Sequence, residues 1–184
     1  MALTESYMLP LGTKAPEFYL TNTTDNKKNG LNELKGKNGS IVIFMCNHCP
    51  YVVHLIDNII KTAKKYVSKG INTIAISSNS IKTHPQDGPE EMKKLAINKK
   101  FSFPYLSDQT QEVAKKYSAT CTPDFYLFNK DLELIYRGRY DDSRPGNKKP
   151  ITGKDLHNAI DHMLNEETNN SKQYPSMGCN IKWH

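Results

Sequence analysis

The stretch Ile41-Val42-Ile43-Phe44-Met45-Cys46-Asn47-His48-Cys49-Pro50 decides the fold, because two cysteines directly follow a short apolar run. The run from Ile41 to Met45, bounded by Gly39-Ser40, predicts a strand that is buried on both faces. Downstream, apolar residues recur at helical spacing as far as Gly70, with lysines largely on the other side. This pattern predicts a long amphipathic helix. The two cysteines are therefore expected where a buried strand leads into a helix.

That position favours redox chemistry. The first backbone amides of a helix have no intrahelical partner and the helix dipole is positive there, so a thiolate is favoured over a thiol. We expect Cys46, at the mouth of the helix, to be the reactive thiol. Cys49, one turn further in, is placed to resolve a mixed disulfide, and no prosthetic group is needed. Pro50 fits this prediction, because proline is tolerated in the first turn of a helix.

Other uses of the paired cysteines fit the sequence less well. Structural zinc needs about four ligands, usually from two such pairs, and the chain has no second CxxC. Covalent haem attachment requires a histidine directly after the second cysteine, where this chain has Pro50. A structural disulfide would close a very short loop, in a chain that shows no sign of export. We therefore expect a redox-active Cys46-Cys49 couple and no metal.

Composition indicates the domain organisation of the chain and the cellular environment of this site. At 184 residues the chain is most simply one domain, with the main body at 1–167 and a tail at 168–184. The net charge of +6 comes from lysines spread along the helical segments, which predicts a solvated surface rather than a nucleic-acid site. Neither a signal peptide nor a membrane span is legible. We expect a soluble, cytoplasmic protein, in which paired cysteines are more often catalytic or metal-bound than structural.

The rest of the chain alternates strands and helices. Further strands are predicted at 15–20, 71–77, 125–128 and 132–136, and further helices at 31–34, from Pro89 onward, at 111–117 and from Thr152 onward. Thr152 with Asp155 resembles a capping box at the head of the last helix. Segment 83–89 is rich in turn formers and is predicted to be a loop. Ile181 and Trp183 beside Cys179 predict that the tail docks on the body.

Four motifs carry a family resemblance, namely 46–52, 120–124, 138–142 and 177–183. With the order of elements they resemble the thioredoxin-like superfamily, in its redoxin branch related to alkyl hydroperoxide reductase and thiol-specific antioxidant. The bacterial group concerned is described as probable thiol-disulfide oxidoreductases, and the resemblance covers almost the whole chain. It implies an α/β thioredoxin-like fold with a central mixed β-sheet flanked by helices. The implied fold also has an N-terminal strand extension, an insertion before the Thr-Pro loop and a C-terminal tail.

The resemblance also implies a substrate-binding position. In thioredoxin-like proteins a cis-proline faces the CxxC, and the residue before it pairs through its backbone with the substrate chain as an added strand. Here these residues are Thr122 and Pro123. Without the family pattern, Pro123 simply starts a strand.

We assign redox tuning to Asn47, His48 and Pro50, and above all to His48. A cationic or hydrogen-bonding imidazole beside Cys46 stabilises the thiolate and makes the disulfide more oxidising. The position matches the histidine in the CxxC of protein disulfide isomerases. We therefore expect a redox potential above that of thioredoxin, which His48→Pro lowers. The alternative is a solvent-facing histidine with no role.

Cys121 and Cys179 are candidate auxiliary thiols. Cys121 precedes Thr122 and so lies near the site, but strand alternation can turn its side chain away from Cys46 and leave it as a buried free cysteine. Cys179 on the tail has three alternatives: pairing with Cys121, a relay thiol, or a free cysteine. Our hypothesis is that the tail brings Cys179 close to Cys121.

Three functions follow. The first is a thiol-disulfide oxidoreductase acting on protein or low-molecular-weight thiol or disulfide substrates, recycled by a reductase or a thiol pool, as a monomer or weak dimer. The second is a thiol peroxidase with antioxidant activity, although the proline and threonine that precede a peroxidatic cysteine are replaced by Gly39 and Ile43. The third is a copper- or zinc-binding module using Cys46, Cys49 and a histidine such as His54.

Overall fold

A seven-stranded mixed sheet forms the centre of the protein. The computed structural model describes residues 3–184. The sheet has the strand order β3-β2-β6-β5-β4-β8-β9. Its strands are β2 (Tyr19–Asn22), β3 (Lys28–Gly30), β4 (Gly39–Phe44), β5 (Ile71–Ser77), β6 (Tyr105–Ser107), β8 (Asp124–Asn129) and β9 (Leu134–Gly138). Strands β4 and β5 run parallel, whereas β8 is antiparallel to β4 and β9 is antiparallel to β8.

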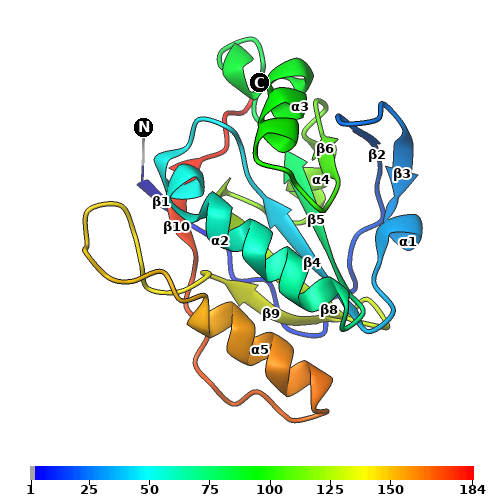
Figure 1. Cartoon of the computed structure of the whole chain (residues 1–184), viewed down its shortest axis with the longest axis vertical. Coiled ribbons are helices and arrows are strands. Elements are labelled where there is room, and N and C mark those ends of the chain that lie inside the picture. The colour runs from blue at the N-terminus through cyan, green and yellow to red at the C-terminus, as the bar shows by residue number, and fades with distance from the viewer. Residues whose placement is uncertain (1–2) are drawn as a thin grey trace.

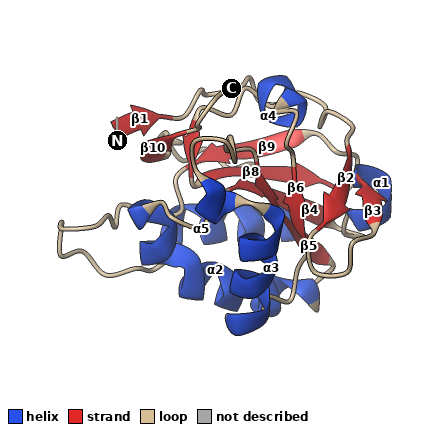
Figure 2. Cartoon of the chain, turned by 90° about the horizontal axis from the view of Figure 1, so that it is seen from above, coloured by secondary structure: helices blue, strands red, loops and turns tan. Residues whose placement is uncertain are grey.

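Helices cover both faces of this sheet (Figures 1 and 2). On one face lie α2 (Pro50–Val67), α3 (Pro89–Asn98) and α5 (Lys154–Leu164), and on the other lies the short α4 (Glu112–Lys116). Helix α1 (Leu31–Leu34) lies at the edge of the sheet beside β3. The fold is the thioredoxin-like α/β fold expected from the sequence, with a central mixed sheet flanked by helices.

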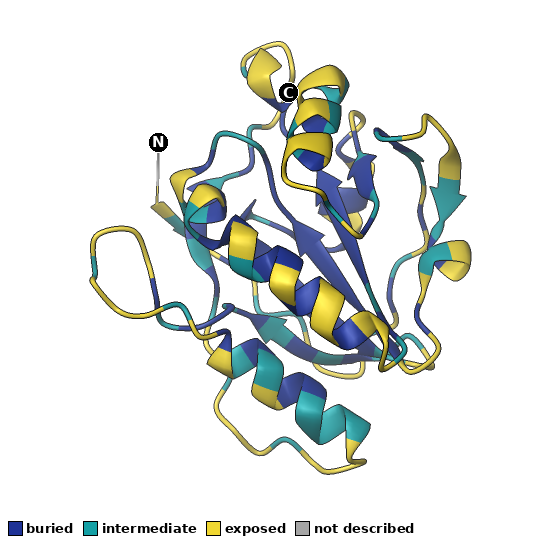
Figure 3. Cartoon of the chain, in the orientation of Figure 1, coloured by how far each residue is buried: buried dark blue, intermediate teal, exposed yellow. Residues whose placement is uncertain are grey.

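Strand β4 is buried along its whole length, as its apolar run predicts. Its side chains alternate between two cores. Ile41 and Ile43 pack in the core beneath α2 and α5, whereas Val42 and Phe44 pack in the core on the α4 side. The dark blue strands at the centre of Figure 3 show this burial, and the yellow side of α2 faces solvent. Burial on both faces therefore fixes the end of β4, and with it the start of the cysteine loop.

Helix α5 does not begin with the capping box that the sequence predicts. The N-cap is Gly153, and Thr152 and Asp155 do not cap each other. Instead the Asp141 carboxylate accepts hydrogen bonds from the amides of Thr152 at 2.6 Å and Gly153 at 2.7 Å. Asp155 is turned toward Arg139, with Oδ2 2.5 Å from Nε. A capping acid from a distant loop therefore replaces the local box.

A second, three-stranded sheet holds the two ends of the described chain. In it β10 (Met177–Asn180) lies between β1 (Leu3–Glu5) and β7 (Cys121–Thr122), antiparallel to both. Figure 1 shows the red β10 beside the blue β1, close to the start of α2. The C-terminal tail thus packs against the strand that precedes Pro123. Across residues 3–184, no helix is both long enough and apolar enough to cross a membrane.

Candidate active site

The two cysteines of the CxxC occupy a short loop between β4 and α2. Cys49 is the N-cap of α2 and Pro50 is in its first turn, so the helix begins after the second cysteine. Cys46 lies three residues before this N-cap. It is therefore upstream of the helix mouth, whereas the sequence predicts it at the mouth itself. The residues are 1% and 0% exposed respectively, and both are present as thiols. The pair is therefore enclosed by the structures that surround the loop.

The two sulfurs share a hydrogen bond, and this bond shifts the pKa values of Cys46 and Cys49 in opposite directions. The pKa of Cys49 is lowered to about 5, first because it accepts a hydrogen bond from the Cys46 thiol and then because Cys179 and Thr122 also contact it. The pKa of Cys46 is raised by its bond to Cys49, by burial and by the charge of Asp87. In the reduced pair the thiolate therefore resides on Cys49. This differs from the expected Cys46 thiolate, because the free helix amides are at Cys49 and an acid faces Cys46.

Asp87 is the functional residue that the sequence did not reveal. It belongs to a single 3₁₀ turn, η1 (Pro85–Asp87), within the segment expected to be a loop, and it is 2% exposed. Its Oδ1 accepts from the Asn47 amide at 2.9 Å, and its Oδ2 accepts from Asn79 Nδ2 at 2.8 Å. The His48 amide approaches Oδ1 at 3.3 Å. These donors satisfy a buried carboxylate directly beside the cysteine loop.

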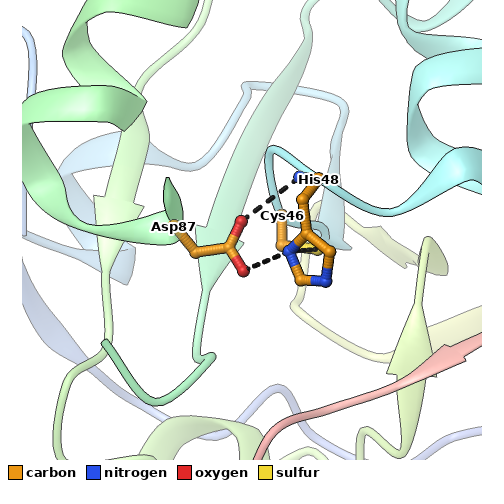
Figure 4. Close-up of side chains that lie close together, drawn as sticks. All are labelled: Cys46, His48 and Asp87. Atoms are coloured by element: carbon orange, nitrogen blue, oxygen red, sulfur yellow. Dashed lines mark hydrogen bonds and ion pairs between the residues drawn. The ribbon is translucent and has the colours of Figure 1, made fainter. Parts of the chain in front are cut away.

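His48 lies between Asp87 and Cys46 (Figure 4). Its Nδ1 lies 2.6 Å from Asp87 Oδ2 and 3.9 Å from Cys46 Sγ. The ring stacks on that of His84, with centroids 4.9 Å apart, and only 16% of the His48 side chain is exposed. The imidazole thus faces the pair instead of solvent, which is where a tuning role needs it. The neighbouring Asn47 anchors the loop, because its Nδ2 donates to the Gln86 carbonyl at 2.9 Å.

The same three side chains are the candidate metal ligands. One ligand atom each from Cys46, His48 and Asp87 lies within 4.8 Å of the others. However, the 2.6 Å separation of Nδ1 from Oδ2 is that of a charge-assisted hydrogen bond, and a metal would have to break it. His54, the histidine that the sequence offers as a further ligand, is hydrogen-bonded through Nε2 to Ser143 Oγ at 2.8 Å. The geometry favours a hydrogen-bonded triad over a metal centre.

Thr122 and Pro123 face the cysteine pair from the other side, and the peptide bond between them is cis. Thr122 Oγ1 lies 3.5 Å from Cys46 Sγ, and the Thr122 carbonyl oxygen lies 3.1 Å from Cys49 Sγ, which donates to it only while Cys49 is protonated. One residue therefore contacts both sulfurs. Its backbone edge, which the resemblance offers to a substrate chain, is occupied by β10.

The two remaining cysteines lie on either side of this small sheet. Cys179 pairs with Thr122 and Asn180 pairs with Cys121. Because neighbouring side chains of a strand alternate, Cys179 projects on the Thr122 face and Cys121 projects on the opposite face. The tail does bring Cys179 next to Cys121 on the paired strand, as expected. A disulfide needs Cβ atoms that point toward each other, so the opposite faces of the two side chains disfavour a bond between them. Cys179 instead shares a hydrogen bond with Cys49.

A cavity of about 190 Å³ opens beside Pro123. It lies between the start of α2, the loop that follows β9 and the segment leading into β10. Its lining combines aromatic, apolar and charged side chains, among them Tyr51, Pro123, Arg139 and Met177. A mixed lining of this kind suits part of a peptide or a small thiol compound.

Paired cysteines at the start of a helix in a thioredoxin-like fold, with a cis-proline opposite, define a class of thiol-based oxidoreductases. A family model described as Redoxin matches residues 10–156, and the chain belongs to this family. Membership gives it an oxidoreductase role in thiol chemistry. No curated protein matches the chain.

Solved structures share the fold of this chain. An uncharacterized conserved protein from Geobacillus kaustophilus is 47% identical, with a TM-score of 0.98 over 100% of this chain and 97% of that one. A hypothetical protein from Sinorhizobium meliloti is 39% identical, with a TM-score of 0.95 over 98% of each chain. The thioredoxin domain of a thiol-disulfide oxidoreductase from Bacteroides vulgatus shares the fold. It is 19% identical, with a TM-score of 0.66 over 85% of this chain and 99% of that one.

Proposed function

We propose that the protein is a thiol-disulfide oxidoreductase that uses Cys46 and Cys49 as a dithiol-disulfide couple. The observation that carries this proposal is the arrangement of the two sulfurs, which share a hydrogen bond and both contact Thr122. We expect these two buried neighbouring thiols to form a disulfide when they are oxidised. The substrate is a disulfide in a protein or in a low-molecular-weight compound.

The pKa values of Cys46 and Cys49 determine the order of the steps in the proposed exchange reaction. The proton of Cys46 passes along the hydrogen bond to the Cys49 thiolate, and Cys46 attacks one sulfur of the substrate disulfide. The other substrate sulfur leaves and takes up that proton from Cys49. The Cys49 thiolate then attacks Cys46, the second substrate sulfur leaves as a thiolate, and the Cys46-Cys49 disulfide remains. The substrate gains two electrons and the protein loses two.

The cycle closes when a reductase or a thiol pool reduces this disulfide. We place the reaction in the cytoplasm, where such reductants keep thiols reduced, and we expect a monomer or weak dimer. Thr122 and Pro123 position the substrate disulfide beside Cys46, and the cavity next to Pro123 accommodates an adjoining part of the substrate. Asn47 and His48 set the acidity of the couple through Asp87.

Turnover of a disulfide substrate tests the proposal. Cys46→Ser and Cys49→Ser should each reduce turnover at least 100-fold, and Cys49→Ser should trap the substrate as a mixed disulfide on Cys46. Cys121→Ser is the matched control, because Cys121 is equally buried but projects on the other face of its strand. Full activity of Cys46→Ser would refute the proposal. Turnover driven by peroxide and not by disulfides would replace it with a thiol peroxidase.

A further inference from the structure

The C-terminal strand brings a third sulfur to the active site. In the pairing of β10 with β7, Cys179 lies directly opposite Thr122. Side chains directly opposite each other in an antiparallel pair project from the same face, with Cβ atoms about 4.5–5.5 Å apart. The Thr122 side chain points at Cys46, and the Thr122 carbonyl contacts Cys49. Cys179 is therefore aimed at the CxxC by the register of the strand.

Cys179 interacts with Cys49, which also interacts with Cys46. Cys49 shares hydrogen bonds with Cys46 on one side and with Cys179 on the other. All three sulfurs are enclosed, since Cys179 is only 4% exposed and packs in the same core as Cys46 and Cys49. Cys46 and Cys179 are therefore both candidate disulfide partners of Cys49.

Close packing of the backbone holds Cys179 in this place. A Cβ on the preceding residue, Gly178, would lie only 2.0 Å from the Thr122 carbonyl oxygen. Only glycine allows β10 to approach Thr122 this closely. Beyond Cys179, the Ile181 amide donates to the Thr120 carbonyl at 3.0 Å, and the Lys182 amide donates to Asn79 Oδ1 at 2.8 Å. The tail is thus hydrogen-bonded on both sides of the cysteine.

We propose that Cys179 is a third redox-active thiol, which exchanges with the Cys46-Cys49 disulfide to give a Cys49-Cys179 disulfide. This inference rests on the proposed function, because that reaction supplies the oxidised pair. The Cys179 thiolate attacks the sulfur of Cys49, the bond between Cys46 and Cys49 breaks, and Cys46 leaves as a thiolate that takes up the proton given up by Cys179. No electrons enter or leave the protein.

The exchange gives the tail a function. β10 occupies the backbone edge beside Pro123 as a built-in substrate strand, and Cys179 takes the place of a substrate cysteine. In the Cys49-Cys179 form the tail is covalently tied to this edge, and Cys46 is again a thiol. The protein then has two oxidised isomers, and in one of them the disulfide prevents β10 from leaving the edge that a peptide substrate needs.

Disulfide mapping of Cys46→Ser after incubation with oxidised glutathione tests the inference. Cys49 attacks oxidised glutathione and releases reduced glutathione, and Cys179 then displaces the second glutathione. We expect one intramolecular disulfide between Cys49 and Cys179 in most of the protein. Trypsin leaves Cys49, Cys121 and Cys179 on separate peptides, so mass spectrometry identifies the linked pair.

Two controls make the result specific. Cys46→Ser with Cys121→Ser should give the same disulfide, whereas Cys46→Ser with Cys179→Ser should retain glutathione on Cys49. Retention of glutathione by Cys46→Ser, or a link from Cys49 to Cys121, would overturn the inference. The single variant Cys179→Ser distinguishes failure of this inference from failure of the proposed function. If it still forms the Cys46-Cys49 disulfide and turns over substrate, the proposed function stands whatever the mapping shows.

Discussion

The two sides of Cys49 are built in different ways. The Cys46 side is polar and is organised around one buried carboxylate, Asp87, which is hydrogen-bonded to His48 and Asn79. The tail side is organised mainly by backbone pairing, in which Cys179 is positioned by the register of β10 on β7. Asn79 links the two sides, because it also accepts from the Lys182 amide. The comparison teaches that charge controls the acidity of one side, whereas the packing of strands controls the position of the other. Substitutions should therefore affect the two sides differently.

The largest effect is expected from Asp124, which lies beneath the tail side. It follows Pro123 directly and is 1% exposed, and its Oδ2 accepts from the Tyr126 hydroxyl at 2.8 Å. Its Oδ1 has no hydrogen-bond partner within residues 3–184. Burial raises the pKa of Asp124 to about 7. The folded protein therefore holds this proton over a pH range in which the unfolded chain, with a pKa of about 3.9, has lost it.

The sign of the pH dependence follows from this difference. The stabilisation is fully present below about pH 4 and is lost as the pH rises through about 7. Because one pKa unit corresponds to about 1.4 kcal/mol, the free energy of unfolding should fall by up to about 4 kcal/mol over this range. Asp124→Asn should remove most of this fall, as measured by urea unfolding at pH 5 and pH 8. Asp57→Asn on the exposed side of α2 is the control, and an equal pH dependence in Asp124→Asn and the wild type would contradict the assignment.

The next largest effect is expected from Gly178, where the tail approaches Thr122. Gly178→Ala places a methyl group against the Thr122 carbonyl, and overpacking of this kind costs about 1–3 kcal/mol. We expect urea unfolding to show a loss in this range, and Cys179 to react faster with iodoacetamide in the folded protein. Gly30→Ala is the matched control, since its Cβ would meet its nearest neighbour at an ordinary 3.5 Å. Unchanged stability and unchanged alkylation of Cys179 would show that the tail does not depend on this contact.

The sequence predicted the centre of the fold because the relevant signals are local. The apolar run at 41–45, the helical periodicity that follows and the second apolar strand each carry their own pattern, and they appear as β4, α2 and β5. The family resemblance supplied the position opposite the cysteines, at Thr122 and Pro123. These predictions depend on neighbouring residues in the sequence or on the family resemblance, and not on contacts between distant segments.

What the sequence did not provide depends on contacts between distant segments. Asp87 is a single acid in a turn-rich segment, and no local pattern places it beside Cys46. The expectation that Cys179 lies close to Cys121 holds, but only the register of β10 determines that Cys179 projects on the Thr122 face. The predicted capping box failed for the same reason, since Asp141 arrives from another loop to cap α5. Long-range geometry of this kind has no signature in a single sequence.

The smallest effect is expected on the polar side, from Asp87. Its negative charge is the third cause of the raised pKa of Cys46, after the hydrogen bond to Cys49 and burial. Asp87→Asn removes this charge while keeping the size of the side chain, so the pKa of Cys46 should fall. A more acidic thiol stabilises the reduced pair and makes the disulfide more oxidising. We expect the redox potential to rise by about 30 mV, which equals about 1.4 kcal/mol for a two-electron couple.

Equilibration with reduced and oxidised glutathione measures this potential in the wild type, in Asp87→Asn and in the control Asp57→Asn. The control should leave the potential unchanged, because Asp57 is exposed and forms an ion pair with Lys99. A lower potential in Asp87→Asn would mean that Asp87 acts mainly by holding His48, since the lost orientation of the imidazole then outweighs the lost charge. The sign of the change therefore decides whether charge or position dominates on the Cys46 side.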